Sequence, residues 1–170
     1  MNSWNDLFAQ APPSMRSETL RLAILGIGHE LYGDDGVGLH AARRLQAACG
    51  QLPDVLVIEA GPSPENFTGP LRRFKPDLVV MIDAVDMGEP PGSLRWIEWP
   101  DVDGLSAATH RMPPGTLATF LMRELGCQVA LLGIQVGEIA FDRPLTPEVS
   151  AALKAILVNP IQFMEQNYPK

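Results

Sequence analysis

Two neighbouring aspartates, Asp34 and Asp35, follow a glycine-rich turn near the start of the sequence. The turn lies in ILGIGHELYGDDGVGLH, residues 24–40, and gives Gly28 and Gly33 the G-x-x-x-x-G spacing of a phosphate-binding loop. Such a loop needs a lysine after the second glycine to neutralise phosphate charge, whereas this sequence has two carboxylates there. The pattern therefore indicates a site for a cation rather than for an anion.

A third aspartate and a histidine are candidates for the same site. Asp83 follows the apolar run LVVMI, and His110 lies in SAATHRMPPG, just before a predicted helix. Two aspartates and one histidine would form an incomplete coordination shell for a divalent transition metal, with positions left open for water or substrate. Each residue also has an ordinary explanation: Asp35 could cap a helix, Asp83 could end a strand, and His110 could bond a backbone carbonyl.

The elements that must position these residues are predicted by hydrophobic patterns. Unbroken apolar runs such as Leu78–Ile82 are typical of strands buried on both faces of a parallel sheet. We predict an α/β fold, a three-layer α/β/α sandwich whose open, mostly parallel, twisted sheet has about five strands, one of them an antiparallel edge strand. The predicted strands cover 20–28, 54–60, 76–84, 92–99 and 128–136; the predicted helices cover 36–48, 63–74, 113–125 and 146–158, with Ser63 and Thr146 as N-caps.

The predicted topology brings the acidic residues together. In open α/β sheets, ligands bind at the carboxyl ends of the strands, where the strand order reverses. If the order begins 2-1-3, the first and third strands are neighbours, and the loop with Asp34 and Asp35 meets Asp83 at one crevice. His110 precedes a helix that would start at the same edge of the sheet. This convergence favours a shared site over three unrelated explanations.

Length and composition favour one globular domain without a membrane span. The 170 residues are 46% hydrophobic and carry a net charge of −7, and no apolar run reaches the ~18 residues that cross a bilayer. We expect a flexible extension at residues 1–18, a single domain at 19–170 and a cytoplasmic location. The negative charge argues against nucleic acid and membrane as partners. Two distant cysteines, Cys49 and Cys127, are expected to be buried thiols.

Two other functions use similar residue patterns. A dinucleotide-binding loop would need glycine where the sequence has Leu31, although Glu59 stands where a ribose-binding acid would lie. A phospho-receiver domain, which is a signalling module, also holds a divalent cation with an acidic pair after the first strand and an aspartate after the third. It would have lysine at the end of the last core strand, where this sequence has Gln135. The receiver-like signalling domain is the main alternative to an enzyme.

Several blocks of the sequence resemble the hydrogenase maturation endopeptidases, which remove a C-terminal peptide from the large-subunit precursor of [NiFe] hydrogenases after nickel insertion. The resemblance covers about residues 20–157, and the DAVDMG and THRMP blocks look most like the branch that serves formate-hydrogenlyase-type hydrogenases. The matching blocks are ILGIGHELYGDDGVG, IEAGPSPEN, VVMIDAVDMGEPPGSLRWIE, THRMPPG and LLGIQVGEIAFDRPLTPEV.

The resemblance implies a site, a cofactor and a partner. It implies an aspartyl-type endopeptidase in which Asp35, Asp83 and His110 bind nickel and form the catalytic site. The nickel would be presented by the hydrogenase large-subunit precursor, and the protease would recognise it as a maturation signal; other divalent metals such as cadmium or zinc could replace it in vitro. One departure is His29, where the family usually has asparagine. That imidazole is either an outward-facing substitution or an additional ligand.

Two mechanisms remain open at this point. The metal could polarise the scissile carbonyl and activate water, which makes it the catalyst. Alternatively, it could serve only in recognition, with Asp34 or Asp83 acting as general base on water. The glycines between residues 26 and 38 either let the substrate backbone approach closely or serve only turn geometry and helix–sheet packing.

Overall fold

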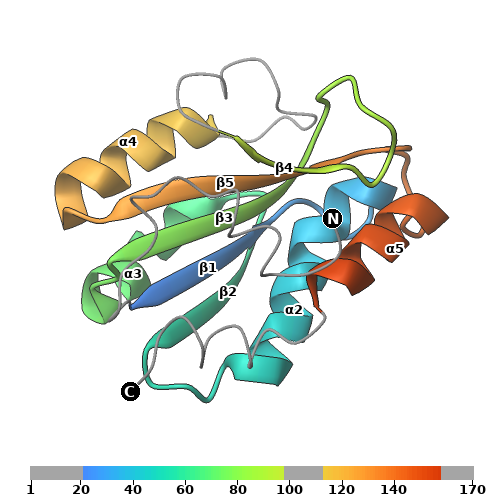
Figure 1. Cartoon of the computed structure of the whole chain (residues 1–170). Helices are drawn as coiled ribbons and strands as arrows, with labels where there is room; N and C mark the ends of the chain where they lie inside the picture. Colours follow the sequence, from blue (N-terminus) through green and yellow to red (C-terminus); the bar gives the residue numbers. More distant parts are fainter. Residues whose placement is uncertain (1–20, 98–112, 158–170) are drawn as a thin grey trace.

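A computed structural model describes residues 21–97 and 113–157, and these residues form one mixed sheet covered by helices (Figure 1). The strand order is β2-β1-β3-β5-β4, with β4 antiparallel to β5 and the other neighbouring pairs parallel. The order therefore begins 2-1-3, as assumed from the sequence, and the predicted antiparallel edge strand is confirmed. The strands are β1 (Leu22–Ile27), β2 (Val55–Gly61), β3 (Leu78–Val85), β4 (Leu94–Ile97) and β5 (Gln128–Gln135).

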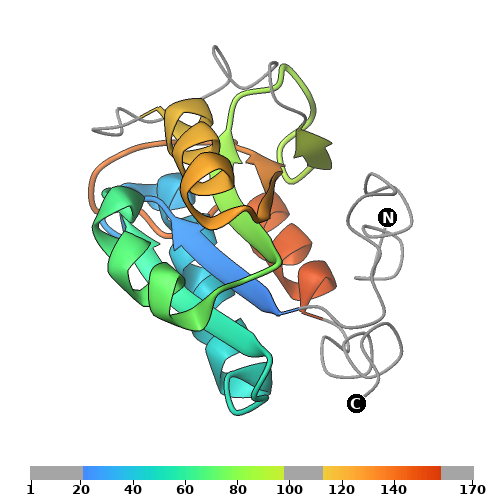
Figure 2. The same ribbon diagram turned by 90° about the vertical axis from the view of Figure 1, so that its left-hand side faces the viewer.

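Helices cover both faces of the sheet and complete the predicted three-layer sandwich. One apolar core joins the sheet to α2 and α5, and a second joins its other face to α3 and α4. Figures 1 and 2 show the two helix pairs on opposite sides of the strands. The helices are α2 (Val37–Cys49), α3 (Thr68–Phe74), α4 (Pro114–Leu125) and α5 (Pro147–Ile156), with short 3₁₀ turns η2 (Gly33–Gly36) and η3 (Pro64–Phe67).

The central strands are buried on both faces, as their continuous apolar runs predict. All residues of β1 and β3 are buried. Successive side chains alternate between the two cores: Leu22 and Ile24 pack on the side of α2, whereas Ala23 and Leu25 pack on the side of α4. The same alternation decides which way the polar residues of these strands face.

Two glycines allow α2 to lie directly against the strands. A Cβ atom at Gly38 would collide with the carbonyl oxygens of Ile27 and Ile82, and one at Gly26 would collide with the Gly38 carbonyl and with Ala42. Gly26 and Gly38 therefore serve helix–sheet packing, which is one of the two roles that the sequence allows for these glycines. This close approach holds the start of α2 at the ends of β1 and β3.

Several predicted element ends, and one predicted cap, differ from the structure. The helix predicted at 63–74 is divided into η3 and α3, because Pro70 has no N–H to continue the hydrogen-bond ladder across the junction. Ser63 precedes η3 without making a side-chain cap hydrogen bond. Strand β3 continues to Val85, so Asp83 lies within the strand and does not end it. The predicted extension at residues 1–18 falls outside the described residues.

Both cysteines are buried, as predicted. The Cys49 thiol donates a hydrogen bond to the Leu45 carbonyl at 3.1 Å, and burial raises the pKa of this thiol to about 11. Cys127 is also buried, and its pKa is raised mainly by the same desolvation. In the described part of the chain, no helix is long and apolar enough to cross a membrane.

The pKa of Cys49 predicts that the free energy of unfolding falls as the pH rises from 9 to 11. In this window the thiol of the unfolded chain ionises near its usual pKa of 9, whereas the folded thiol stays protonated up to about 11. Ionisation therefore favours the unfolded chain, by up to about 1.4 kcal/mol per pH unit. Urea unfolding across this window should give a shallower pH dependence for Cys49→Ala than for the wild type; equal slopes would contradict the prediction.

Candidate active site

The candidate site lies where β1 and β3 separate at the carboxyl edge of the sheet. The two strands pair as far as Gly26 and Ile82, and Asp83 is the next residue of β3. The 3₁₀ turn η2, which carries Asp35, contacts β3. Both side chains are removed from solvent, with Asp35 4% exposed and Asp83 fully buried. The structure thus places these two predicted residues at the switch point of the sheet.

Asp83 faces the layer that contains α4. It alternates in β3 with Ile82 and Ala84, which belong to the core beside α2, so its side chain lies on the opposite face. One carboxylate oxygen accepts the N–H of Ala84 at 2.8 Å. His110 precedes α4 in the sequence but lies outside the described residues, so its predicted place beside Asp83 stays a prediction.

Asp35 is held by the turn around it. Its N–H donates to the Tyr32 carbonyl at 3.3 Å, and its own carbonyl packs against Gly28. Gly28 has φ 128°, and a Cβ there would collide with the Asp35 carbonyl oxygen, so this position requires glycine. The residue that caps α2 is Gly36, without a side-chain cap bond. The alternative role of Asp35 as a helix cap is therefore wrong.

Asp34 has a structural role that the sequence did not reveal. Its carboxylate is fully buried and accepts the N–H groups of Gly137, Glu138 and Thr146 at 2.7–2.9 Å. The Thr146 hydroxyl lies 2.9 and 3.1 Å from the two oxygens. These contacts occupy both oxygens, which removes Asp34 from the candidate general bases. They also correct the predicted cap, because the Thr146 hydroxyl bonds Asp34 and makes no cap bond to α5.

A second buried polar side chain organises the neighbouring loop. Gln135, at the end of β5, accepts the N–H groups of Met87 and Glu89 at 2.6 and 3.3 Å. Its amide nitrogen donates to Asp86 and to the Val136 carbonyl at 3.2 and 3.1 Å. Gln135 thus fixes the loop that follows β3, at the position where a receiver domain would have its lysine.

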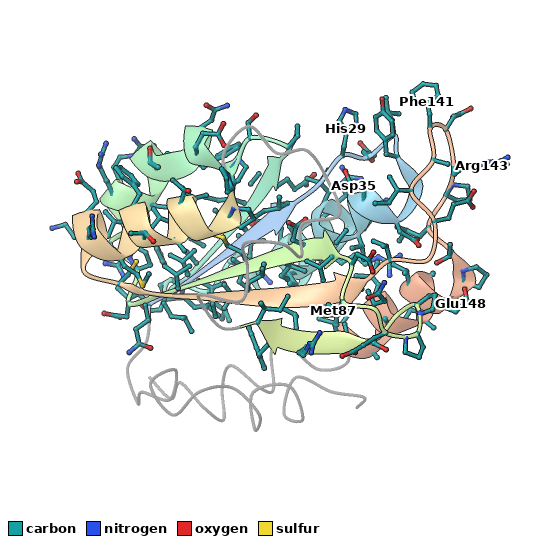
Figure 3. All side chains as sticks on the ribbon, turned by 90° about the horizontal axis from the view of Figure 1, so that it is seen from above. His29, Asp35, Met87, Phe141, Arg143 and Glu148 are labelled. Carbon is teal, nitrogen blue, oxygen red and sulfur yellow. The ribbon has the colours of Figure 1, made fainter. Side chains whose placement is uncertain are left out.

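The loop after β1 also meets the β5–α5 loop through aromatic side chains. The ring of His29 packs edge-on against Tyr32 at 4.8 Å, and Tyr32 contacts Phe141 at 5.6 Å. Figure 3 shows His29, Asp35 and Phe141 at the same corner of the molecule. The Nδ1 atom of His29 accepts the N–H of Leu31 at 3.3 Å. His29 therefore contributes a hydrogen bond and a ring contact to its own turn.

Glu59, the residue at the place of a ribose-binding acid, makes an ion pair at the surface. Its carboxylate lies 2.9 Å from Arg43, which also binds Glu30 at 2.8 Å. This network links the end of β2 to the loop after β1. The Glu59 carboxylate is thus paired with the Arg43 guanidinium, and this surface ion pair gives no support to dinucleotide binding.

The described residues include two of the three predicted metal ligands. Within residues 21–97 and 113–157, no group of three or more His, Cys, Asp or Glu side chains is arranged to hold a metal ion. Asp35 and Asp83 supply two buried carboxylates from separate elements, which is a donor set that suits a divalent cation. The third predicted ligand, His110, belongs to the segment outside these ranges. Metal binding at this edge of the sheet therefore stays a prediction.

Comparison with known proteins identifies the family. The family model described as hydrogenase maturation protease matches residues 39–161. The hydrogenase 3 maturation protease of Escherichia coli K12 is 33% identical over 134 residues, covering 78% of this chain and 84% of that protein. The chain belongs to the hydrogenase maturation protease family. It is therefore a hydrolase of the endopeptidase class, as the sequence motifs predict.

Solved structures of hydrogenase maturation proteases share the fold. A crystal structure of the [NiFe] hydrogenase maturation protease HycI from Thermococcus kodakarensis KOD1 superposes with a TM-score of 0.78 at 28% identity, covering 96% of this chain and 98% of that one. A solution structure of the endopeptidase HycI from Escherichia coli gives 0.69 at 33% identity, covering 78% and 84%. Membership of this protease family excludes the receiver-like signalling domain as the function.

Proposed function

We propose that this protease is nickel-dependent and removes the C-terminal peptide of a [NiFe] hydrogenase large-subunit precursor in the cytoplasm. Asp35, Asp83 and His110 are the proposed nickel ligands and catalytic residues. The observation that carries the proposal is the pair of buried carboxylates, Asp35 and Asp83, presented by separate elements where β1 and β3 diverge. Carboxylates at the ligand-binding edge of an α/β sheet are suited to holding a divalent cation and to transferring a proton.

The proposed role of nickel is to identify the precursor that has received its metal. The precursor brings the ion in its own metal centre, and Asp35, Asp83 and His110 complete the coordination only when the large subunit is loaded. Nickel so bound can polarise a carbonyl or lower the pKa of water. Because Asp34 is fully engaged by the β5–α5 loop, Asp83 is the remaining candidate base of the recognition mechanism.

The proposal predicts that only the nickel-loaded precursor is cleaved. The protease is first treated with chelator and exchanged into chelator-free buffer, then incubated with loaded precursor and with the nickel-free precursor from the same preparation. Mass spectrometry of the large subunit should show loss of the C-terminal peptide in the loaded sample alone, because the ion is needed to join the carboxylates to the substrate.

Two controls sharpen this experiment. Restoring nickel to the metal-free precursor should restore cleavage, which excludes damage to the substrate. Adding nickel to the protease and then removing unbound ion should not make metal-free precursor cleavable. Equal cleavage of loaded and metal-free precursor would disprove recognition through nickel.

A further inference from the structure

Asp34 and Asp35 are adjacent in sequence, but their side chains point in different directions. A 3₁₀ turn has about three residues per turn, so neighbouring side chains point roughly 120° apart. In η2 the Asp34 carboxylate faces the β5–α5 loop, where it receives N–H groups from Gly137, Glu138 and Thr146. Because these hydrogen bonds hold the Asp34 side chain in the loop, they also fix the direction in which the Asp35 side chain leaves the turn.

The turn is held from both sides. On one side, the Asp35 carbonyl packs against Gly28 at the end of β1. On the other, the Asp34 N–H donates to the Glu138 carbonyl at 3.1 Å, and a Cβ at Gly33 would come within 2.9 Å of the same oxygen. The buried Asp34 carboxylate sits within this contact, and its hydrogen bonds to neutral donors are strengthened by its charge.

We propose that Asp34 is a positioning residue for peptide cleavage: by joining η2 to the β5–α5 loop, its carboxylate holds Asp35 in the geometry that the reaction needs. The inference rests on the proposed function of Asp35. Asp34 acts through its neighbour and touches neither substrate nor metal. Its removal should therefore lower the rate of the chemical step more than the affinity for the precursor.

Asp34→Asn is the variant that tests this role with the least change in size. The groups of the described residues that hydrogen-bond the carboxylate are donors, and N–H donors approach both of its oxygens. An asparagine NH₂ must then meet an N–H in either amide orientation, so the loop contact is broken. We expect kcat for cleavage of the nickel-loaded precursor to fall about 10-fold to 100-fold, with KM changed less than about twofold.

Amide hydrogen exchange gives a second readout, independent of activity. In Asp34→Asn, exchange should accelerate in residues 33–38 and 136–146. Leu71→Ala serves as the matched control, because Leu71 is fully buried in the core on the opposite face from α2 and α5. It should lower the melting temperature while leaving kcat and exchange in those two segments as in the wild type. A fall in kcat for Leu71→Ala equal to that of Asp34→Asn would overturn the inference.

If Asp34→Asn does not fold, Thr146→Val tests the positioning role of Asp34. This variant removes only the hydroxyl donor and keeps the backbone N–H on Asp34. We expect kcat to fall severalfold at unchanged KM. Wild-type kcat in a folded Asp34→Asn, or in Thr146→Val where the former is insoluble, would overturn the inference.

Asp35→Asn separates this inference from the proposed function. If Asp35→Asn loses cleavage and Asp34→Asn keeps it, the positioning role alone is wrong. If Asp35→Asn cleaves like the wild type, the proposed function of Asp35 is wrong and the positioning role fails with it.

Discussion

Asp83→Asn should reduce cleavage of the nickel-loaded precursor by about 100-fold or more. Asparagine has nearly the same size as aspartate, and its carbonyl oxygen can still accept the N–H of Ala84, which the Asp83 carboxylate binds at 2.8 Å. The substitution therefore removes the charge while keeping the strand. Loss of either an anionic metal ligand or a general base lowers the rate of catalysis by a factor of this size. Cleavage is measured as the mass change of the precursor under single-turnover conditions.

Asp77→Asn is the matched control for this prediction. Asp77 lies just before the opposite end of β3, is exposed, and accepts the N–H of Arg21 at 2.8 Å. It should cleave at the wild-type rate, since it lies at the amino edge of the sheet. Circular dichroism should show both variants folded. A folded Asp83→Asn with wild-type cleavage would remove Asp83 from the site.

Gly38→Ala should lower the free energy of unfolding by about 3 kcal/mol or more. The added methyl group would meet the carbonyl oxygens of Ile27 and Ile82, which are backbone atoms of buried strands and cannot rotate away. Helix α2 must then move off the sheet, and overpacking of this kind costs about 1–3 kcal/mol even where side chains can adjust. Urea unfolding followed by circular dichroism measures the change.

Gly69→Ala provides the comparison for Gly38→Ala. Each glycine is the second residue of its helix, but the nearest group to a Cβ at Gly69 is the end of the Arg73 side chain at 3.8 Å. Alanine is favoured over glycine in helices by up to about 1 kcal/mol, but Pro70 opposes this gain by crowding the Cβ of the residue before it, so Gly69→Ala should change stability by less than about 1 kcal/mol. Similar unfolding midpoints for the two variants would show that α2 is not closely fitted to the strands.

The arrangement of the sheet could be predicted because its signals are local and strong. The apolar runs of β1, β3 and β5 are those of strands buried on both faces, and the apolar residues of α2 recur at helical spacing. The right-handed crossover rule puts the loops after β1 and β3 at one edge of the sheet, and with the assumed order 2-1-3 it places Asp35 and Asp83 at that edge. The break between η3 and α3 does have a signal in the sequence, because Pro70 lies inside the predicted helix and proline interrupts the hydrogen-bond ladder.

The roles of Asp34, Thr146 and Gln135 could not be predicted in the same way. Each of these roles depends on a partner far along the chain or on loop geometry, and the spacing of hydrophobic residues predicts neither. Asp34 and Asp35 have the same side chain and adjacent positions, so only the direction of each around the 3₁₀ turn separates a structural residue from a candidate ligand. Thr146 has the sequence signature of a helix cap, yet a buried carboxylate competes for its hydroxyl.

The contact between Asp34 and Thr146 also bears on the order in which the protein folds. It joins residues that are 112 positions apart, so the turn carrying Asp35 is completed only when the chain has been made as far as the start of α5. Contacts of such sequence separation form late, because the loop between them must close first. We therefore expect that, in the growing chain on the ribosome, the turn carrying Asp35 is not fixed in place until the start of α5 has been made.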